Sequence, residues 1–478
     1  MSSNACFVEE KVMQQNQLTK DELILLTIKR LGINGEGIGF YKRQTVFVPN
    51  ALPGEVVEVR ITSTDKKFAT GEVTKTKVYS PDRVEPKCPY FKKCGGCQLQ
   101  HLSYDGQLRE KKNLVVEAFE RYYDGDVSKI EFRDTIGMKI NGKDDPWGYR
   151  NKSSLPTRHD GERVVAGMYA INSNMLVYIT DCLIENETIN KVRKHILDIF
   201  TKENIDVFNP KTHRGSLRYL IIRAFPNQKD VQVTCVLTRE DNKIIRILKN
   251  LDVASANYTI NNDLKAVEII NGEVINVKGE KQISGVLGGL KFKISPEAFF
   301  QLNTVQTVKL YDEIKKACEL TKEEKLLDCY CGIGSIGMYL ASGAKEVRGI
   351  DVNASGIENA NNFAKTNNVK NAKFYHGNIL PHLHQFKDDG FVPDVVVVDP
   401  PRSGIELNVL NYLQKAKYKR IVYVSCNPAT LAKNINHLQK VYKINYVQPI
   451  DMFPQTANVE TICVLTNRAG NTKCNLDM

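Results

Sequence analysis

Asp328-Cys329-Tyr330-Cys331-Gly332-Ile333-Gly334-Ser335-Ile336-Gly337 is the stretch that decides the fold of the C-terminal part of this chain. It follows an apolar segment, Lys325–Cys329, which has the pattern of a buried strand, and it leads into a helical pattern that begins at Ser335. Its glycines permit a tight turn and allow a ligand to approach the backbone closely. A strand, a glycine turn and a helix in this order predict a ligand-binding turn in an α/β fold.

Strands and helices continue to alternate after this turn. Apolar segments at 346–350, 373–375, 394–398 and 420–425 are separated by segments with helical periodicity, such as 354–366. Alternation of this kind predicts a doubly wound, Rossmann-like α/β sheet. We place this domain at residues 291–478.

The ligand expected at the glycine turn is S-adenosylmethionine. The glycine spacing also fits NAD, and Asp351, at the end of the next strand, suits the ribose hydroxyls of either molecule. Asp328 stands directly before the turn, where a carboxylate could meet an ammonium or sulfonium group. The strand 394–398 ends in Asp399-Pro400-Pro401-Arg402, near where a methyl group would point. These two features favour the methyl donor, and a dehydrogenase is the alternative.

A cysteine ends the next strand, in Val424-Ser425-Cys426-Asn427-Pro428. Because the carboxyl ends of parallel strands share one edge, Cys426 and Asp399 are expected in one site. A thiol beside a methyl donor indicates methylation of a carbon that is not itself nucleophilic. Uracil C5 fits, since a thiolate can add to C6 while a base removes the C5 proton. We seek that base within 451–460, where Glu460 begins the last apolar strand; a solvated carboxylate is an equal alternative for Glu460, and a buried structural thiol is the alternative for Cys426.

Two further domains are expected before residue 291. Residues 18–80 hold short β-like segments between glycine turns, which predicts a small five-stranded barrel of the oligonucleotide-binding kind. Residues 81–290 mix helical and strand patterns, including an amphipathic helix at 103–123, and predict a central α+β domain. Its turn Tyr149-Arg150-Asn151-Lys152 could grip RNA or be a solvated loop.

Three cysteines are spaced as metal ligands. Cys88, Cys94 and Cys97 form a C-x5-C-x2-C loop with two glycines, and thiolate loops of this kind bind zinc or iron–sulfur clusters. Cys182 is the best candidate for a fourth ligand, and His101 is a local competitor. The spacing leaves the choice between zinc and a cluster open.

Composition limits the cellular setting. The chain has 478 residues, 12 cysteines and a net charge of +11, which permits a polyanionic partner such as RNA. It contains no apolar run near the roughly 20 residues that span a bilayer, and its first 20 residues show no signal core, so we expect a cytoplasmic protein without membrane contact.

The motifs together resemble the RNA uracil-5-methyltransferase family, of the type that forms 5-methyluridine in 23S ribosomal RNA, over nearly the whole chain. Residues 18–80 resemble a TRAM domain, an RNA-binding module, in Gly35–Phe40 and Ala51–Glu55. The other shared motifs, in chain order, are Cys94-Gly95-Gly96-Cys97, Phe300-Gln301-Leu302-Asn303, Asp328–Gly334, Asp399-Pro400-Pro401-Arg402-Ser403-Gly404, Ser425-Cys426-Asn427-Pro428, Asp451-Met452-Phe453-Pro454 and Val459-Glu460.

The resemblance implies a role for each site residue. Cys426 would be the nucleophile and Glu460 the proton acceptor. Cys88, Cys94, Cys97 and Cys182 would hold a four-iron four-sulfur cluster, and the helix 103–123 would pack on the catalytic domain. The implied contacts of S-adenosylmethionine are Gln301, Tyr330, Asp351 and Asp399, with the Gly332 and Gly334 turn, and less firmly Ser335 and Asn378.

The resemblance also implies the substrate. Members with a TRAM domain and a cluster act on large-subunit ribosomal RNA, so we expect a monomer that methylates this RNA before or during ribosome assembly. The alternatives are the T-loop uridine of transfer RNA and an inactive RNA-binding protein. Gln455 and Asn458 stand where the family usually has histidines, which argues against an imidazole function at those two positions.

Overall fold

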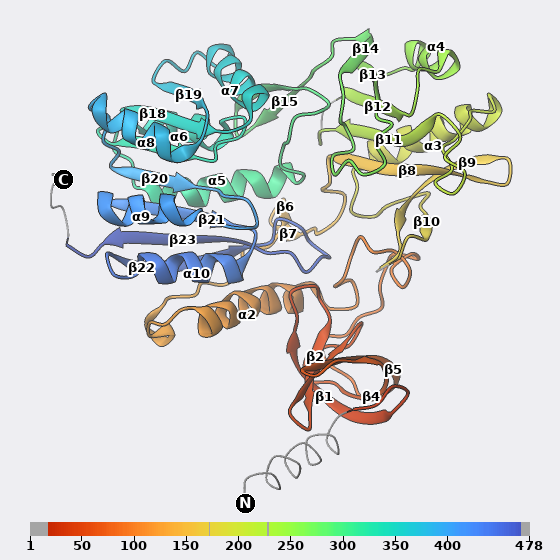
Figure 1. The fold of residues 1–478 in the computed structure, drawn as a ribbon, viewed down its shortest axis with the longest axis horizontal. Coiled ribbons are helices and arrows are strands. Elements are labelled where there is room, and N and C mark those ends of the chain that lie inside the picture. The colour runs from red at the N-terminus through yellow and green to blue at the C-terminus, as the bar shows by residue number, and fades with distance from the viewer. Residues whose placement is uncertain (1–17, 172, 227–228, 470–478) are drawn as a thin grey trace, which may run out of the picture. The chain divides into compact units, whose positions relative to one another are not determined.

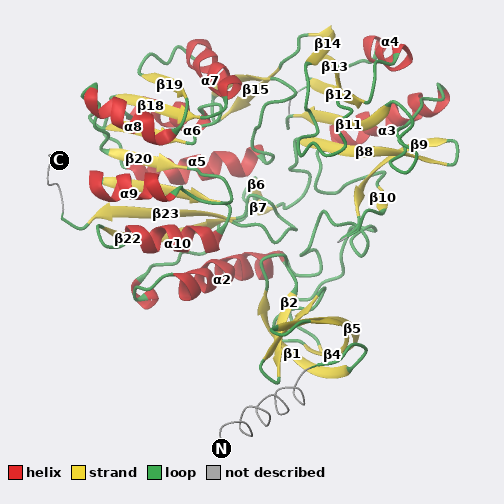
Figure 2. Cartoon of the chain, in the orientation of Figure 1, coloured by secondary structure: helices red, strands yellow, loops and turns green. Residues whose placement is uncertain are grey.

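The computed structural model describes residues 18–171, 173–226 and 229–469. These residues form two compact units, one with residues 18–114 and 455–458 and the other with the remaining described residues. No helix in these ranges is long and apolar enough to cross a membrane. Figure 1 gives the element labels used below, and Figure 2 distinguishes helices from strands.

The first unit contains a closed five-stranded barrel, as the glycine-punctuated pattern of residues 18–80 predicts. The strands are ordered β1-β2-β3-β5-β4 around the barrel. Their burial alternates along the chain, so that Ile24, Leu26 and Ile28 of the first strand point into the apolar interior. The strands are β1 (Leu23–Leu31), β2 (Gly37–Tyr41), β3 (Gln44–Val48), β4 (Val56–Thr64) and β5 (Phe68–Val78).

The C-terminal part of the second unit is the doubly wound sheet expected from the alternating pattern. Its strand order is β19-β18-β17-β20-β21-β23-β22, and the five strands from β17 to β21 are mutually parallel. Only β23 and β22, at one edge, run antiparallel to their neighbours. The strands are β17 (Lys325–Cys329), β18 (Glu346–Asp351), β19 (Ala372–His376), β20 (Val395–Val398), β21 (Arg420–Ser425), β22 (Tyr442–Ile450) and β23 (Glu460–Asn467).

Two separate apolar cores cover the two faces of this sheet. Val395 and Val397 of β20 pack on one face, while Val396 and Val398 pack on the other, because successive side chains in a strand point to opposite sides. This explains why β20 is a continuous valine run rather than an alternating pattern. The first face is covered by α5 (Thr304–Cys318), α6 (Ser335–Leu340) with η2 (Ala341–Gly343), and α7 (Ala354–Thr366).

The second face is covered by α8 (Ile379–Asp388), α9 (Leu407–Ala416) and α10 (Pro428–Leu438). Val115 and Phe119, from the end of α2 (Tyr104–Tyr122), belong to the same core, and Phe119 packs edge-on against Phe132. The last turns of α2 therefore pack with the doubly wound sheet, which is called the catalytic sheet below because the candidate site lies at its edge. A short 3-10 helix, η1 (Val127–Lys129), follows α2.

The central part of the second unit is a seven-stranded sheet with two helices. Its order is β10-β9-β8-β11-β12-β13-β14, and only β12 and β13 pair in parallel. Phe200 of α3 and Ile244 of α4 are buried against it. The elements are β8 (Lys152–Asp160), β9 (Arg163–Tyr169), β10 (Leu176–Tyr178), α3 (Glu187–Lys202), β11 (Leu217–Ala224), β12 (Val231–Leu237), α4 (Asn242–Asn250), β13 (Ser255–Ile260) and β14 (Val274–Gly279).

An aromatic cluster joins the central sheet to the catalytic sheet. Phe225, directly after β11, meets the rings of Phe292 and Phe300 at centroid distances of 5.1 and 5.5 Å, and these two rings are 4.5 Å apart. All three residues belong to the core of the catalytic domain. The remaining short strands of this unit are β6 (Lys139–Ile140), β7 (Lys143–Asp144), and the hairpin β15 (Ile283–Leu287) and β16 (Leu290–Ile294).

Candidate active site

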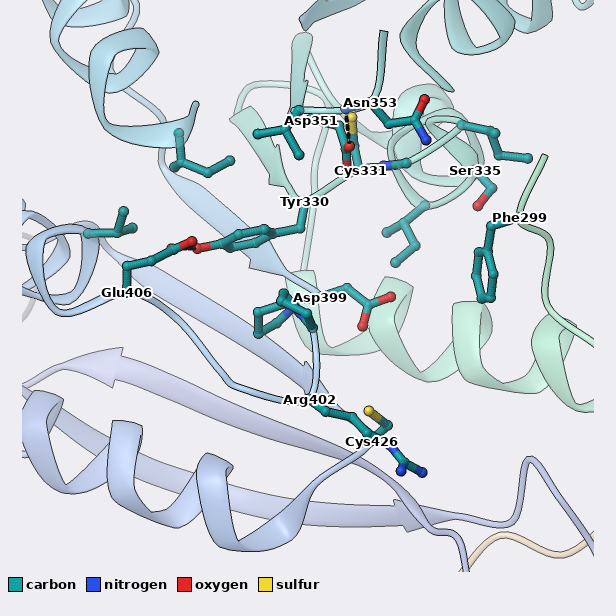
Figure 3. Close-up of a pocket in the computed structure, with 18 of the residues that line it drawn as sticks. Phe299, Tyr330, Cys331, Ser335, Asp351, Asn353, Asp399, Arg402, Glu406 and Cys426 are labelled. Carbon is teal, nitrogen blue, oxygen red and sulfur yellow. Dashed lines mark hydrogen bonds between the residues drawn. The ribbon is translucent and has the colours of Figure 1, made fainter. Parts of the chain in front are cut away.

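A pocket of about 990 Å³ lies where the parallel strands of the catalytic sheet end. Figure 3 shows its two poles, the glycine turn around Cys331 and Asp351 on one side and Cys426 with Arg402 on the other. Asp399 lies between them. The pocket is lined by nine of the ten catalytic and cofactor residues predicted from the sequence, namely Gln301, Tyr330, Gly332, Ser335, Asp351, Asn378, Asp399, Cys426 and Glu460.

The glycine turn is held by the carboxylate of Asp351. One oxygen of Asp351 accepts a hydrogen bond from the Gly332 backbone N–H at 2.8 Å, and the other accepts one from Asn353 N–H at 2.8 Å. Gly332 has a φ of +56°, and no atom within 4 Å would touch a Cβ built on it. The turn therefore presents bare backbone to the pocket, which suits close approach of a ligand.

Gly334 is the predicted residue that does not line the pocket. It has a φ of +73°, and a Cβ there would lie 2.6 Å from the Phe374 ring and 2.9 Å from the Ala360 Cβ. Its absence of a side chain therefore serves the packing of α6 against the sheet.

Asp328 does not reach the pocket either, so the expectation that it meets a charged ligand group is wrong. Its side chain is fully buried and accepts a hydrogen bond from Gly337 N–H at 2.8 Å. Burial, helped by the charges of Asp399 and Asp351, raises the pKa of Asp328 to about 8. This hydrogen bond stabilises the first turn of α6.

Cys426 stands on a turn that its neighbours fix rigidly. The Asn427 side chain caps α10 by accepting from Ala429 N–H at 3.2 Å, and Pro428 occupies the first turn of that helix. The Asn427 amide also donates to the Arg402 carbonyl at 3.1 Å, as does the Thr430 hydroxyl at 3.1 Å. These two bonds tie the Asp-Pro-Pro-Arg loop to the turn that carries the thiol.

Glu460 is brought beside Cys426 by the register of two strands. Ser425, the last residue of β21, pairs with Thr461 of the antiparallel strand β23, so the next residue of one strand faces the preceding residue of the other. Burial raises the pKa of Glu460 well above its usual range, the charge of Asp399 raises it further, and Arg402 opposes both effects. Burial also raises the pKa of Asp399. The pocket thus contains a buried carboxyl group at Glu460 and a half-buried one at Asp399, and both hold protons more tightly than carboxyl groups in water.

The thiol of Cys426 is half-buried and lies beside Arg402. Burial raises its pKa, as do the charges of Glu460 and Asp399, whereas the charge of Arg402 and a hydrogen bond from it lower the pKa. The N-terminus of α10 also favours the thiolate. Among the residues that shift this pKa, Arg402 carries the positive charge, so it favours the thiolate form of Cys426 against the effect of the Glu460 and Asp399 carboxyl groups.

Three residues of the pocket were not selected from the sequence. Phe299 is 74% exposed at the pocket, whereas its neighbour Phe300 is buried. Tyr311 of α5 shares a hydrogen bond of 2.6 Å with Ser335, and Glu406 accepts a hydrogen bond from Tyr330. The Phe-Phe doublet was visible in the sequence, but which ring faces the core depends on the loop path. Tyr311 and Glu406 gave no signal beyond ordinary helix and loop positions.

The turn 149–152 does not present its side chains to RNA as one alternative supposed. Tyr149 is 2% and Asn151 is 1% exposed. The Tyr149 hydroxyl donates to the Pro454 carbonyl, and the Asn151 amide donates to the Gln301 carbonyl. An RNA-gripping role is therefore wrong for these two side chains.

The cysteine loop lies in the first unit. Cys97 is buried, Cys88 and Cys94 are half-buried, and Gly96 N–H donates to the Cys94 sulfur at 3.4 Å. His101 is buried, and burial lowers its pKa to about 4. Cys182 belongs to the second unit, and throughout the part of the chain that the structure describes, no three His, Cys, Asp or Glu side chains come together as a metal site.

Gln455, at one of the two positions that depart from the family pattern, belongs to the first unit. The Gln107 side-chain amide donates a hydrogen bond to the Gln455 side-chain oxygen at 3.0 Å. In return, the Gln455 backbone N–H donates to the Gln107 side-chain oxygen at 3.0 Å. Its carbonyl accepts from Gln98 and Leu99 N–H at 3.1 and 3.0 Å. Gln455 thus fixes the 455–458 segment within that unit, and Asn458 bonds locally to Thr456.

The chain is similar to known RNA methyltransferases. Residues 103–468 match the family model described as tRNA (Uracil-5-)-methyltransferase, and residues 19–74 match the TRAM domain. The chain is 42% identical to an uncharacterized RNA methyltransferase of Bacillus anthracis, over 95% of this chain and 98% of that protein. It is also 42% identical to one of Halalkalibacterium halodurans, over 94% and 97% respectively.

One solved structure is similar over almost the whole chain. It is the crystal structure of the tRNA (uracil-54, C5)-methyltransferase of Pyrococcus abyssi in complex with S-adenosyl-L-homocysteine. The TM-score is 0.72 at 28% sequence identity, and the match covers 93% of this chain and 100% of that one.

The position of Arg402 predicts how Cys426 titrates. Because Arg402 lowers the pKa of the thiol, Arg402→Ala should move the pH dependence of Cys426 alkylation by iodoacetamide to higher pH and slow alkylation at neutral pH. The rate is followed by mass spectrometry of the peptide that contains Cys426. Lys419→Ala, at the opposite end of β21, is the control and should leave the profile unchanged. An unchanged profile in Arg402→Ala would refute the assigned effect of the guanidinium.

Proposed function

The chain belongs to the tRNA (uracil-5-)-methyltransferase family, and on that premise we propose that it methylates C5 of a uracil in RNA through a covalent bond from Cys426. The family and the TRAM domain both confirm the resemblance seen in the sequence. The observation that carries the proposal is a single pocket lined by the Cys426 thiol, the carboxyl groups of Asp399 and Glu460, and the glycine turn. S-adenosylmethionine, the methyl donor of this family, supplies the methyl group.

Cys426 starts the reaction in this proposal. Its thiolate, stabilised by Arg402, forms a bond to uracil C6, and the electrons of the C5–C6 double bond move toward C5 and O4. C5 becomes nucleophilic and accepts the methyl group. The glycine turn and Asp351, which lie on the far side of Asp399 from Cys426 in Figure 3, would hold the methyl donor together with the pocket residues Gln301 and Tyr330.

Glu460 completes the reaction by removing the C5 proton. The C5–C6 double bond then reforms as the sulfur–C6 bond breaks, which releases 5-methyluracil and the Cys426 thiolate. A carboxylate whose pKa is raised by burial is a stronger base than one in water, so its environment suits this task. Burial raises the pKa of Asp399, which favours its protonated form. In that form the carboxyl group can donate a hydrogen bond to uracil O4.

RNA must deliver an unstacked base to this pocket. Phe299 is a large exposed ring at the pocket, and exposed rings of this kind stack on unpaired bases. The TRAM barrel offers a second RNA contact. Both features support a single-stranded or loop uridine as the target.

We propose a uridine of 23S ribosomal RNA as the substrate. The support is the joint presence of the TRAM domain and the C-x5-C-x2-C loop, which the family members acting on this RNA share. Transfer RNA is the second candidate, favoured by the likeness to the Pyrococcus abyssi tRNA (uracil-54, C5)-methyltransferase.

We also propose that Cys88, Cys94, Cys97 and Cys182 bind a four-iron four-sulfur cluster. The spacing of the three loop cysteines and the N–H donor that Gly96 directs at the Cys94 sulfur support this, because cluster thiolates accept such bonds. No step of the reaction involves the cluster, whose role would be structural.

Covalent trapping tests the reaction. RNA that contains 5-fluorouridine should form a denaturation-resistant complex with the enzyme in the presence of S-adenosylmethionine, because fluorine at C5 cannot leave as a proton. Cys426→Ala should abolish the complex and Cys463→Ala, a buried thiol on β23, should retain it. On natural RNA, Glu460→Gln should accumulate the adduct and lower turnover at least about a hundredfold. A complex formed by Cys426→Ala would overturn the nucleophile assignment.

Methyl transfer to purified RNA tests the substrate. Protein-free 23S ribosomal RNA and bulk transfer RNA from cells lacking the enzyme should be incubated separately with labelled S-adenosylmethionine. We expect label in 5-methyluridine of the ribosomal RNA alone, with Cys426→Ala as the blank. Label in transfer RNA alone would replace the first candidate by the second.

Metal analysis tests the cluster. Protein purified without oxygen should contain about four iron and four sulfide ions per chain and absorb visible light, and Cys94→Ala should lose both properties. Exposed Lys92→Ala, in the same loop, is the control and should keep them. Stoichiometric zinc without iron would show that the loop is a zinc site instead.

A further inference from the structure

The buried turn Tyr149–Asn151 contacts both walls of the active-site pocket. One wall is the segment 299–303, which carries Phe299 and Gln301, and the other is the segment 451–454, which carries Phe453. The turn belongs to the central domain and directly precedes β8, and none of its residues lines the pocket itself. The turn is hydrogen-bonded to both of these segments.

Asn151 holds the wall that carries Gln301. Its side-chain amide donates to the Gln301 carbonyl at 2.9 Å and to the Thr304 hydroxyl at 3.1 Å. Its backbone N–H donates to the Leu302 carbonyl at 2.9 Å, and its carbonyl accepts from Ala224 N–H at 3.0 Å, at the end of β11. Asn151 thereby fastens the Gln301 backbone to the rigid central sheet.

Tyr149 holds the opposite wall. Its buried hydroxyl donates to the Pro454 carbonyl at 3.0 Å, next to the pocket residue Phe453. The two walls are also joined to each other, since the Asn303 amide donates to the Met452 carbonyl at 3.1 Å and the Gln306 amide donates to the Asp451 carbonyl at 2.9 Å. All of these bonds are shielded from water, where a lost partner leaves an unsatisfied polar group.

We infer that Asn151 and Tyr149 are positioning residues of the methyl-transfer site, with Asn151 setting the methyl-donor wall through Gln301 and Tyr149 setting the wall that carries Phe453. This inference deepens the proposed function and depends on it. The central domain then has a catalytic purpose besides any RNA contact, because it supplies the fixed frame against which both pocket segments are hydrogen-bonded.

Binding of S-adenosylhomocysteine to the full chain, measured by calorimetry, tests the Asn151 assignment. Asn151→Ala should weaken binding about three- to tenfold, the effect of losing one or two buried hydrogen bonds. Asn151→Asp should weaken it at least as much, because a carboxylate cannot donate to the Gln301 carbonyl. The matched control is Asn257→Ala, which removes an equally buried amide of the central sheet with two donated bonds, and should leave binding unchanged at a similar loss of thermal stability.

Tyr149→Phe removes one hydroxyl and tests the other wall. It should lower kcat for RNA methylation at least about threefold and leave the affinity for S-adenosylhomocysteine unchanged. Asn151→Ala, in contrast, should weaken that affinity. This variant also decides the matter if Asn151→Ala does not fold. Equal weakening of binding by Asn151→Ala and Asn257→Ala, or a kcat of Tyr149→Phe equal to wild type, would overturn the inference. Wild-type protein that fails to bind S-adenosylhomocysteine would instead refute the proposed function.

Discussion

The pairing of Ser425 with Thr461 is the constraint on which the active site depends. The parallel strands β17, β18 and β20 bring the glycine turn, Asp351 and Asp399 to one edge of the sheet. The antiparallel strand β23 begins at that same edge, and its first residue is Glu460. A parallel strand in this place would begin at the opposite edge and would not bring Glu460 beside the thiol. The antiparallel direction of β23 therefore places a carboxyl group beside the Cys426 thiol, a combination that suits nucleophilic and base chemistry.

Burial sets the protonation of the groups at this edge. Asp399 and Glu460 are both removed from water, so each holds a proton more tightly, and the Cys426 thiol is shifted in the same direction. Arg402 counteracts the shift at Cys426 and at Glu460. Its backbone is tied to the Cys426 turn by Asn427 and Thr430, which keeps the cation beside the thiol. The pocket thus combines a carboxyl group of raised pKa at Glu460 with a thiol whose upward pKa shift Arg402 opposes.

The sequence predicted those features that follow from periodicity and local motifs. The barrel, the doubly wound sheet and nine of the residues that line the pocket were predictable, because glycine turns, valine runs and strand-end polar groups report directly on backbone geometry. The position of Asp328 was not predictable, because a carboxylate before a glycine turn can point to the ligand or beneath the helix. The roles of Tyr149 and Asn151 were hidden for a related reason, since their partners are carbonyls about 150 to 300 residues away. The positions of Phe299 and Tyr311 at the pocket depend on the path of the folded loop and helix, which the sequence pattern does not show.

We propose that the methyl group enters at C5 after Cys426 has made that carbon nucleophilic. The most direct measurement is the release of tritium from RNA that carries [5-³H]uridine, compared with the incorporation of labelled methyl groups in the same reaction. The account predicts equal amounts of tritium released and methyl groups incorporated, with neither in Cys426→Ala. Methyl incorporation without tritium release would contradict it, because the methyl group would then be on another atom of the RNA.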